Sequence, residues 1–153
     1  MAKETTFESI RLIASSVENR VEKARKIADV IRNLGSYRWV GLYDVGTDEV
    51  SIIAYSGPGA PAYPTFPIAK GLTGSAIKEK KTVVVGDVTK DSHYLTAFGS
   101  TKSEIIIPIL DSRRGKVVGT VDVESEHVNA FSDTDRAALE NCASAASKLW
   151  ITE

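Results

Sequence analysis

Residues 103–125, SEIIIPILDSRRGKVVGTVDVES, contain the pattern that decides the fold. Two runs rich in β-branched residues, 103–111 and 116–125, flank the short polar segment 112–115. Apolar strands on either side of a Gly-containing turn are typical of a β-hairpin. The stretch therefore predicts two long antiparallel strands at the centre of the structure.

A second hairpin is predicted upstream, from residues 37–45 and 50–56 around the turn 46–49. Between the hairpins, residues 57–69 hold four of the five prolines and predict a stiff, irregular loop. The remaining elements predicted there are a short helix over 71–80, a short strand over 82–86 and a polar stretch with one helical turn over 87–102.

Long helices are predicted at both ends of the chain. Thr5 and Glu8 match a capping box, and Gly35 is placed to end the helix that follows. Its apolar residues repeat at spacings of three and four, as in an a/d seam: Phe7, Ile10, Ala14, Val17, Val21, Ala24, Ala28 and Ile31. Such a seam suits a helix packed on its own sheet or one shared with a second subunit, and we expect a homodimer.

The chain is thus predicted to be one α+β domain over residues 1–153. It comprises an N-terminal helix (1–35), a sheet with pocket loops (37–125) and a C-terminal helix (132–150), which begins at the capping signal Ser132. We expect an antiparallel sheet with both terminal helices on one face and the loops on the other.

Strand alternation divides the side chains between these two faces. The helix-covered face receives Ile105, Ile107, Ile109, Val117, Val121, Val123, Val40 and Leu42. The opposite face receives two aromatic and three acidic residues: Trp39, Tyr43, Glu104, Asp122 and Glu124. This second face is either solvated or roofed by the loops. Under a roof the carboxylates need a cationic partner, because an unpaired buried charge is costly.

Composition excludes several classes of function. With 19 basic and 20 acidic residues the net charge is −1, so we expect no nucleic-acid partner. No apolar run reaches the 18 or more residues of a membrane span, and the start lacks a signal-peptide pattern, so we expect a cytoplasmic protein without membrane contact. His93 and His127 form no ligand motif, so no metal or cofactor is expected. The single cysteine, Cys142, is predicted to be a small buried hydrophobe of the last helix.

Six segments together resemble a GAF domain: residues 39–43 (WVGLY), 70–74 (KGLTG), 87–88 (DV), 103–109 (SEIIIPI), 119–125 (GTVDVES) and 131–135 (FSDTD). Within that family, the motifs at 39–43 and 103–108 resemble those of the free methionine-(R)-sulfoxide reductases. The resemblance implies a ligand pocket formed by Trp39, Tyr43, Glu104, Asp122 and Glu124, whose carboxylates would hold the amino group of the ligand.

The same resemblance places Tyr63, Thr73 and Ala97 where the reductases carry cysteines. Reduction of a sulfoxide by that chemistry needs a thiolate nucleophile and a resolving thiol, which a hydroxyl cannot replace. No catalytic residue is therefore expected at these positions.

We expect a stand-alone GAF domain that binds a small polar ligand, an amino acid or amine, as a non-catalytic sensor or regulator. A signalling role would need an output protein in trans. Two alternatives stay open: a reductase-like enzyme with an altered active site, and a dimerisation module with a vestigial pocket.

Overall fold

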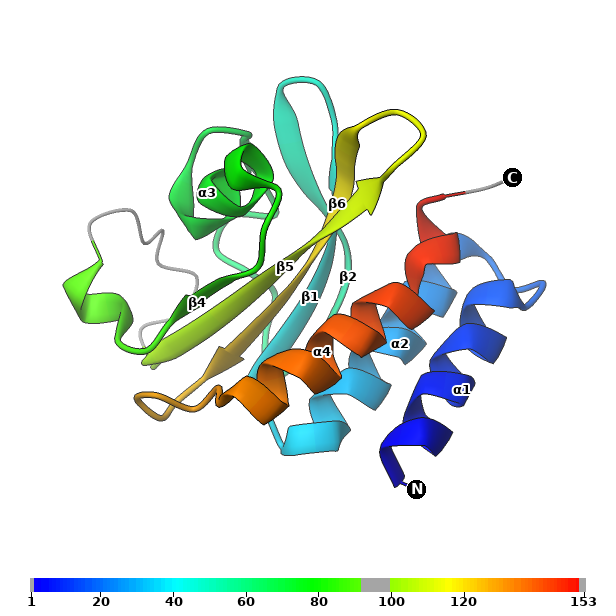
Figure 1. Cartoon of the computed structure of the whole chain (residues 1–153), viewed down its shortest axis with the longest axis horizontal. Helices are drawn as coiled ribbons and strands as arrows, with labels where there is room; N and C mark the ends of the chain where they lie inside the picture. The colour runs from blue at the N-terminus through cyan, green and yellow to red at the C-terminus, as the bar shows by residue number, and fades with distance from the viewer. Residues whose placement is uncertain (1, 92–99, 152–153) are drawn as a thin grey trace.

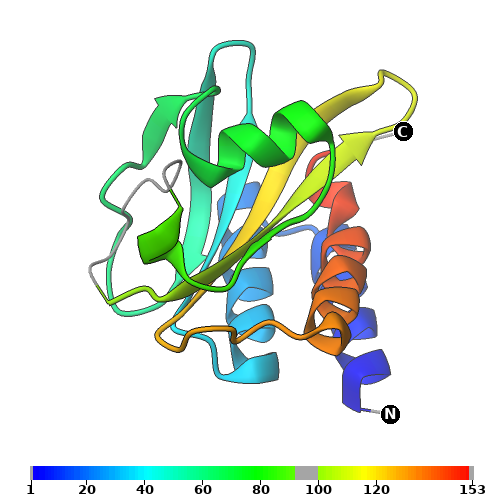
Figure 2. The same ribbon diagram turned by 60° about the vertical axis from the view of Figure 1, so that its left-hand side comes forward.

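The chain folds as a six-stranded antiparallel sheet with three helices on one face and α3 on the other (Figure 1). The computed structural model describes residues 2–91 and 100–151. The elements are α1 (Ala2–Ser15), α2 (Arg20–Gly35), β1 (Trp39–Val45), β2 (Glu49–Ser56), β3 (Thr65–Pro67), α3 (Gly71–Glu79), β4 (Val83–Val85), the 3₁₀ turn η1 (Val88–Lys90), β5 (Ser103–Asp111), β6 (Lys116–Ser125), α4 (Asp133–Ala145) and the 3₁₀ turn η2 (Ser147–Leu149). Figure 2 shows the two layers from the side.

Both predicted hairpins are confirmed as β1–β2 and β5–β6. The strand order β3-β2-β1-β6-β5-β4 joins them through an antiparallel pairing of β1 with β6. The loop that was predicted to be irregular contains one strand, β3, which the prolines did not suggest. This strand pairs with the start of β2 at the edge of the sheet. Pro67 is tolerated there because an edge strand does not need every N–H for the ladder.

The main core lies between the sheet and the helices α1, α2 and α4. The strand residues predicted for this face are buried in it, with one exception, Val117. A register shift between Ile109 and Leu110 leaves Val118 as an extra residue between the pairs Ile109–Gly119 and Leu110–Val117. Such a bulge reverses the alternation beyond it, so Val118 packs on the core in place of Val117.

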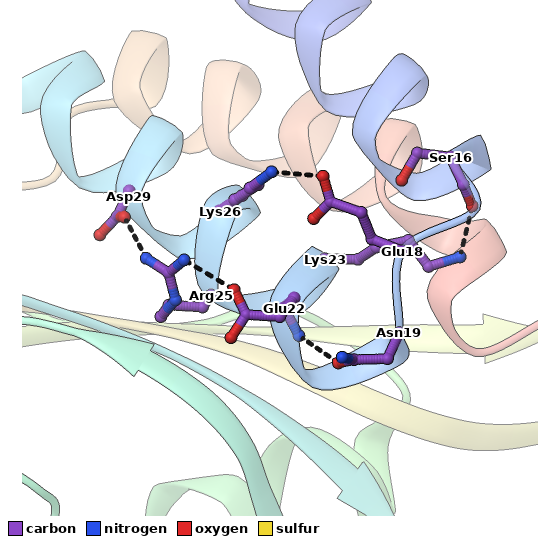
Figure 3. A network of polar contacts seen from close by, with 8 residues as sticks. All are labelled: Ser16, Glu18, Asn19, Glu22, Lys23, Arg25, Lys26 and Asp29. Carbon is purple, nitrogen blue, oxygen red and sulfur yellow. Dashed lines mark hydrogen bonds and ion pairs between the residues drawn. The ribbon is translucent and has the colours of Figure 1, made fainter.

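The single N-terminal helix predicted over residues 1–35 is wrong: the chain turns back between α1 and α2 (Figure 3). Asn19 caps α2, accepting a hydrogen bond from the backbone N–H of Glu22 (2.9 Å). The Lys23 ammonium donates to the carbonyls of Ala14 and Ser16 at the end of α1 (3.2 Å each). Ser and Asn favour caps over helix interiors because their side chains bond the nearby backbone.

The break between α1 and α2 also changes which residues of the expected a/d seam are buried. Val17 lies fully in solvent and Val21 is 55% exposed, whereas Ala24, Ala28 and Ile31 are buried against the sheet. The capping box is wrong as well, because α1 begins at Ala2 and places Thr5 inside the helix. α1 instead packs on α2 and α4. All the buried seam residues therefore pack within one chain, those of α2 against the sheet and those of α1 against α2 and α4.

Hydrogen bonds at one end of the helical layer connect this layer to β1. The Arg20 guanidinium binds both carboxylate oxygens of Asp44 (2.6 Å each) and donates to the carbonyl of Leu149 (2.8 Å). The indole N–H of Trp150 donates to the carbonyl of Tyr43 (3.0 Å). These bonds connect α2, the C-terminal segment and the strand that carries two predicted site residues. Within the described ranges, none of the helices has the length and hydropathy needed to span a bilayer.

The divided helix predicts unequal effects for two residues of the expected seam. Ile31→Ala removes a fully buried side chain and should lower the free energy of unfolding by about 2–5 kcal/mol. Val17→Ala should change it by less than about 0.5 kcal/mol, because Val17 is exposed. Urea denaturation of the two variants measures both values, and comparable losses would support a continuous helix.

Candidate functional site

Three carboxylates lie side by side on the face of the sheet opposite the main core. Glu104 on β5 is directly opposite Glu124 on β6, and Asp122 lies two residues before Glu124 on the same strand. One oxygen from each of the three lies within 4.8 Å of the others. The sequence predicted this cluster because side chains two residues apart on a strand share a face.

All three groups are buried, with exposed fractions of 5% for Glu104, 6% for Asp122 and none for Glu124. Burial disfavours the ionised form of an acid. It raises the pKa of Asp122 from 3.8 to about 6, although a hydrogen bond with Glu104 acts in the opposite direction. Burial and the charge of Asp122 raise the pKa of Glu124 from 4.5 to about 8. The pKa of Glu104 lies well above its ordinary value for the same reasons.

The described residues provide hydrogen-bond partners for only some of the carboxylate oxygens in this cluster. The Thr101 hydroxyl donates to Oε1 of Glu124 (2.6 Å). Within residues 2–91 and 100–151, Oδ1 of Asp122 and Oε2 of Glu124 are buried without a hydrogen-bond partner. Buried polar atoms without partners are uncommon in native proteins and call for a bound group.

An aromatic cluster supports the site from β1. The Trp39 indole stacks on Tyr55 with ring centroids 6.0 Å apart, and its N–H donates to the carbonyl of Gly59 (3.0 Å). The ring occupies the space above Gly41, where an added Cβ would lie 2.2 Å from it. Gly41 therefore lets Trp39 lie flat between the sheet and the 57–70 loop.

Tyr43 extends the aromatic cluster toward the acids. Its ring packs edge-on against Phe66 at a centroid distance of 5.8 Å. Burial, followed by the negative charges of Asp122, Glu124 and Glu104, raises the pKa of Tyr43 far above its usual range. The hydroxyl therefore keeps its proton and remains a hydrogen-bond donor beside the carboxylates.

A small cavity lies between this face and the elements that cover it. Its described lining residues are Tyr43, Pro61, Tyr63, Phe66, Gly71, Leu72, Thr73, Glu104 and Asp122. The free volume is about 30 Å³, room for roughly two water molecules at ~10–15 Å³ each. The proline-rich loop, its strand β3 and the start of α3 form the cover.

The structure thus brings together Tyr43, Glu104 and Asp122 of the five predicted binding residues. Trp39 and Glu124 do not line the cavity, although Trp39 packs on Tyr43 with ring centroids 6.4 Å apart and Glu124 lies within 4.8 Å of the other two acids. Sequence reasoning missed Phe66 and Leu72, because no alternation pattern links the covering loop and helix to the sheet.

The two described positions that resemble lost cysteines, Tyr63 and Thr73, also line the cavity, and Ala97 lies outside the described residues. Cys142 lies in the core on the other side of the sheet, and burial raises its pKa to about 12. Within the described part of the chain, therefore, no thiol lines the cavity.

This arrangement can hold a cation. An ammonium group could donate to several of the three carboxylates at once through charge-assisted hydrogen bonds. The same three residues are a donor set for a metal ion, because hard divalent cations prefer carboxylate oxygens. The sequence predicted the three acids together as a site for an ammonium group and not for a metal, and the expectation of no metal stays a prediction.

The raised pKa values predict that the ligand-free protein loses stability as the pH rises. Below about pH 4 the acids are protonated in both the folded and the unfolded chain. As the pH increases, the unfolded chain ionises first, so the folded state binds more protons and its relative stability falls until about pH 8. Chemical denaturation should give a free energy of unfolding lower at pH 8 than at pH 5 by a few kcal/mol, on the order of 1.4 kcal/mol per unit of pKa.

Glu124→Gln should reduce this pH dependence, since it removes one buried acid while its amide oxygen can still accept from Thr101. Glu79→Gln, at an exposed position of α3, is the matched control and should keep the full dependence. A protein more stable at pH 8 than at pH 5 would show that the three acids are ionised without penalty.

Comparison with known proteins identifies the family to which this chain belongs. Residues 19–149 match the family model described as a GAF domain. The chain is 27% identical to GAF domain-containing protein A of Dictyostelium discoideum over 143 residues, 90% of this chain and 88% of that protein. It is 33% identical to the free methionine-R-sulfoxide reductase of Saccharomyces cerevisiae over 106 residues, 69% of this chain but only 58% of that enzyme.

Solved structures agree with this assignment. The free methionine-R-sulfoxide reductase of Neisseria meningitidis, determined in complex with its substrate, superposes with a TM-score of 0.85 at 28% identity, over 96% of this chain and 87% of that one. The curled antiparallel sheet with helices on both faces is the GAF fold. Since the family model covers most of the chain, this protein belongs to the GAF domain family, and its relatives include free methionine-R-sulfoxide reductases.

Proposed function

We propose that this GAF domain binds a small ligand with a positively charged amino group, an amino acid or amine, without reducing it. The observation that carries the proposal is the unpartnered Oδ1 of Asp122, buried in the wall of the cavity beside Glu104. An ammonium group would satisfy this atom and offset the repulsion among the three acids. The relatives support an amino-acid ligand, since two are named for free methionine sulfoxide, itself an amino acid.

Ligand entry requires the cover to shift, because the cavity leaves room for only about two water molecules. The Trp39–Gly59 hydrogen bond and the pairing of β3 with β2 hold the cover in place. Binding would therefore combine the carboxylate contacts with a movement of the 57–70 loop. A sensor or regulator could use such a movement to signal occupancy, with an output protein acting in trans.

A thermal-shift screen tests the ligand class. A bound ammonium compound stabilises the folded state by about 2.7 kcal/mol at a hundredfold excess over Kd, which raises Tm by several degrees in a domain of this size. Amino acids, their sulfoxides and small amines should raise Tm, and carboxylates of matched size should not. Asp122→Asn and Glu104→Gln should remove the shift and leave the protein folded, while Glu79→Gln should retain it.

Stabilisation by anionic compounds alone would contradict the carboxylate pocket. Hits that survive both Asp122→Asn and Glu104→Gln would place the ligand elsewhere on the protein. If no compound binds, the module with a vestigial pocket becomes the better interpretation.

The enzyme alternative makes a different prediction. Tyr63 and Thr73 offer hydroxyl groups where the resemblance implies cysteines, so NADPH oxidation coupled through thioredoxin should show no turnover of free methionine-(R)-sulfoxide. Cys142→Ser is the control, because Cys142 is the single thiol of the chain. Turnover that this substitution abolishes would overturn the non-catalytic assignment.

We also propose a homodimer, now through two exposed residues of the expected seam, Val17 and Val21, together with Leu12. Leu12, Val17 and Val21 are large apolar side chains that remain more than half exposed around the turn between α1 and α2. A second copy could cover them, and light scattering of the unmodified protein measures the number of copies directly.

A further inference from the structure

The turns of the two hairpins lie at the same end of the sheet (Figure 1). The β1–β6 pairing brings them together, since Asp44 near the end of β1 is opposite Gly119 near the start of β6. The end of α3 joins them, because the ammonium of its C-cap residue Lys80 donates to the carbonyl of Gly115 in the β5–β6 turn (2.8 Å). This end of the molecule is therefore a surface shared by α3 and both hairpins.

A groove of about 450 Å³ lies on this surface, and the deeper part of its lining is apolar. The apolar residues come from β1, from α3, from β6 and from the position after β3, and they are buried or half-buried: Val45, Ile68, Ile77, Val117 and Val118. Three of them, Val45, Ile68 and Ile77, also pack against the aromatic cluster on this side of the sheet. Core packing thus holds the groove in shape, and an apolar side chain of a partner can fill it.

The charged part of the lining is entirely basic. Lys80, Arg114 and Lys116 line the groove, and all three are exposed. Among the residues that the structure describes, no aspartate or glutamate lines it. Arg114 lies 3.8 Å from the Asp111 carboxylate, but 61% of its side chain is exposed, so this weak ion pair leaves the guanidinium accessible. The groove therefore carries local positive charge on a protein whose net charge is −1.

We propose that this groove docks a segment of a partner protein in which an apolar anchor is flanked by acidic residues. Protein interfaces combine an apolar centre with a polar rim, and opposite charges at the rim steer the partner and fix its register. A second copy of this chain does not suit the groove, because two such grooves facing each other would bring like charges together. A small anion does not suit it either, since exposed basic side chains hold a single charge weakly.

The inference goes beyond the proposed ligand site and does not depend on it. α3 borders both places, because its first residues line the cavity and Ile77 lines the groove. Ile68 in the covering segment also lines the groove. A partner bound here would contact the elements that must shift when a ligand enters the cavity. The groove would thus give an output protein access to the cover.

Fluorescence polarisation with labelled peptides and the full chain tests the inference. The probe is a short peptide with a central leucine or phenylalanine flanked by glutamates. One comparison peptide has lysines in place of the glutamates, and another has serine at the centre. The acidic peptide with the apolar centre should bind at low salt and lose affinity as the salt concentration rises, because salt screens the rim charges.

Three results would overturn the proposal. They are no binding of the acidic peptides, equal binding of the lysine peptides, and equal binding of the serine peptide. The last result would show attraction between charges without docking of an apolar side chain.

A double charge reversal, Arg114→Glu with Lys116→Glu, tests the location. Both side chains are exposed, so the variant should fold, which urea denaturation checks. It should weaken binding of the acidic peptide about tenfold or more, because two attractive rim charges become repulsive. Lys90→Glu with Lys102→Glu is the matched control, since these exposed lysines do not line the groove, and it should retain most of the affinity. An equal loss in the control would assign binding to the overall charge and overturn the groove.

Discussion

The burial of Glu104, Asp122 and Glu124 against one another is the constraint on which the rest of this structure depends. Three acids within 4.8 Å, removed from water, repel each other when ionised and are costly to desolvate. The fold meets part of this cost with the Thr101 hydroxyl, which donates to Glu124, and with raised pKa values that favour the neutral acids. Within the described part of the chain, Oδ1 of Asp122 and Oε2 of Glu124 remain without a partner, and the proposed ammonium ligand would offset the cost of their burial.

The sheet can accommodate the three buried acids because its two faces have different roles. The face toward α1, α2 and α4 carries the main apolar core. The opposite face carries two smaller apolar clusters, around Trp39 and around Leu72, and holds the three acids beside them. The bonds from Arg20 and Trp150 to β1 connect the two faces at Asp44 and Tyr43. The site is thus built on rigid strands, and the cover comes from a loop and a short helix.

Membership of the GAF family fits a division between a constant scaffold and a changed chemistry. The carboxylates and Tyr43 occupy the strands, where neighbouring pairings fix their positions. Tyr63 and Thr73 occupy the covering segment, where residues can change without disturbing the sheet. The acids proposed to hold an ammonium group lie on the strands, and Tyr63 and Thr73 contribute two hydroxyl groups to the cavity.

The sequence by itself determined the α+β class, the two hairpins and the face on which most strand residues lie, because alternation with period two is a local property of the backbone. It also identified the acids and the aromatic residues of the site. It could not show that the N-terminal helix divides at Asn19, since the apolar spacing continues through the break while the capping bonds depend on Lys23 and Glu22 folding back. Nor could it place Val118 in the core, because a bulge arises from the pairing of two strands.

Only the tertiary structure decided what surrounds the acids. The β1–β6 pairing sets Trp39 opposite Glu124, and the covering segment brings Phe66 and the first turn of α3 over Asp122. These contacts join residues far apart in the chain, and no periodicity encodes them. Whether a carboxylate on a strand is solvated or buried depends on what lies above it. The sequence therefore left both interpretations open, and the packing of the cover resolved them in favour of a closed pocket.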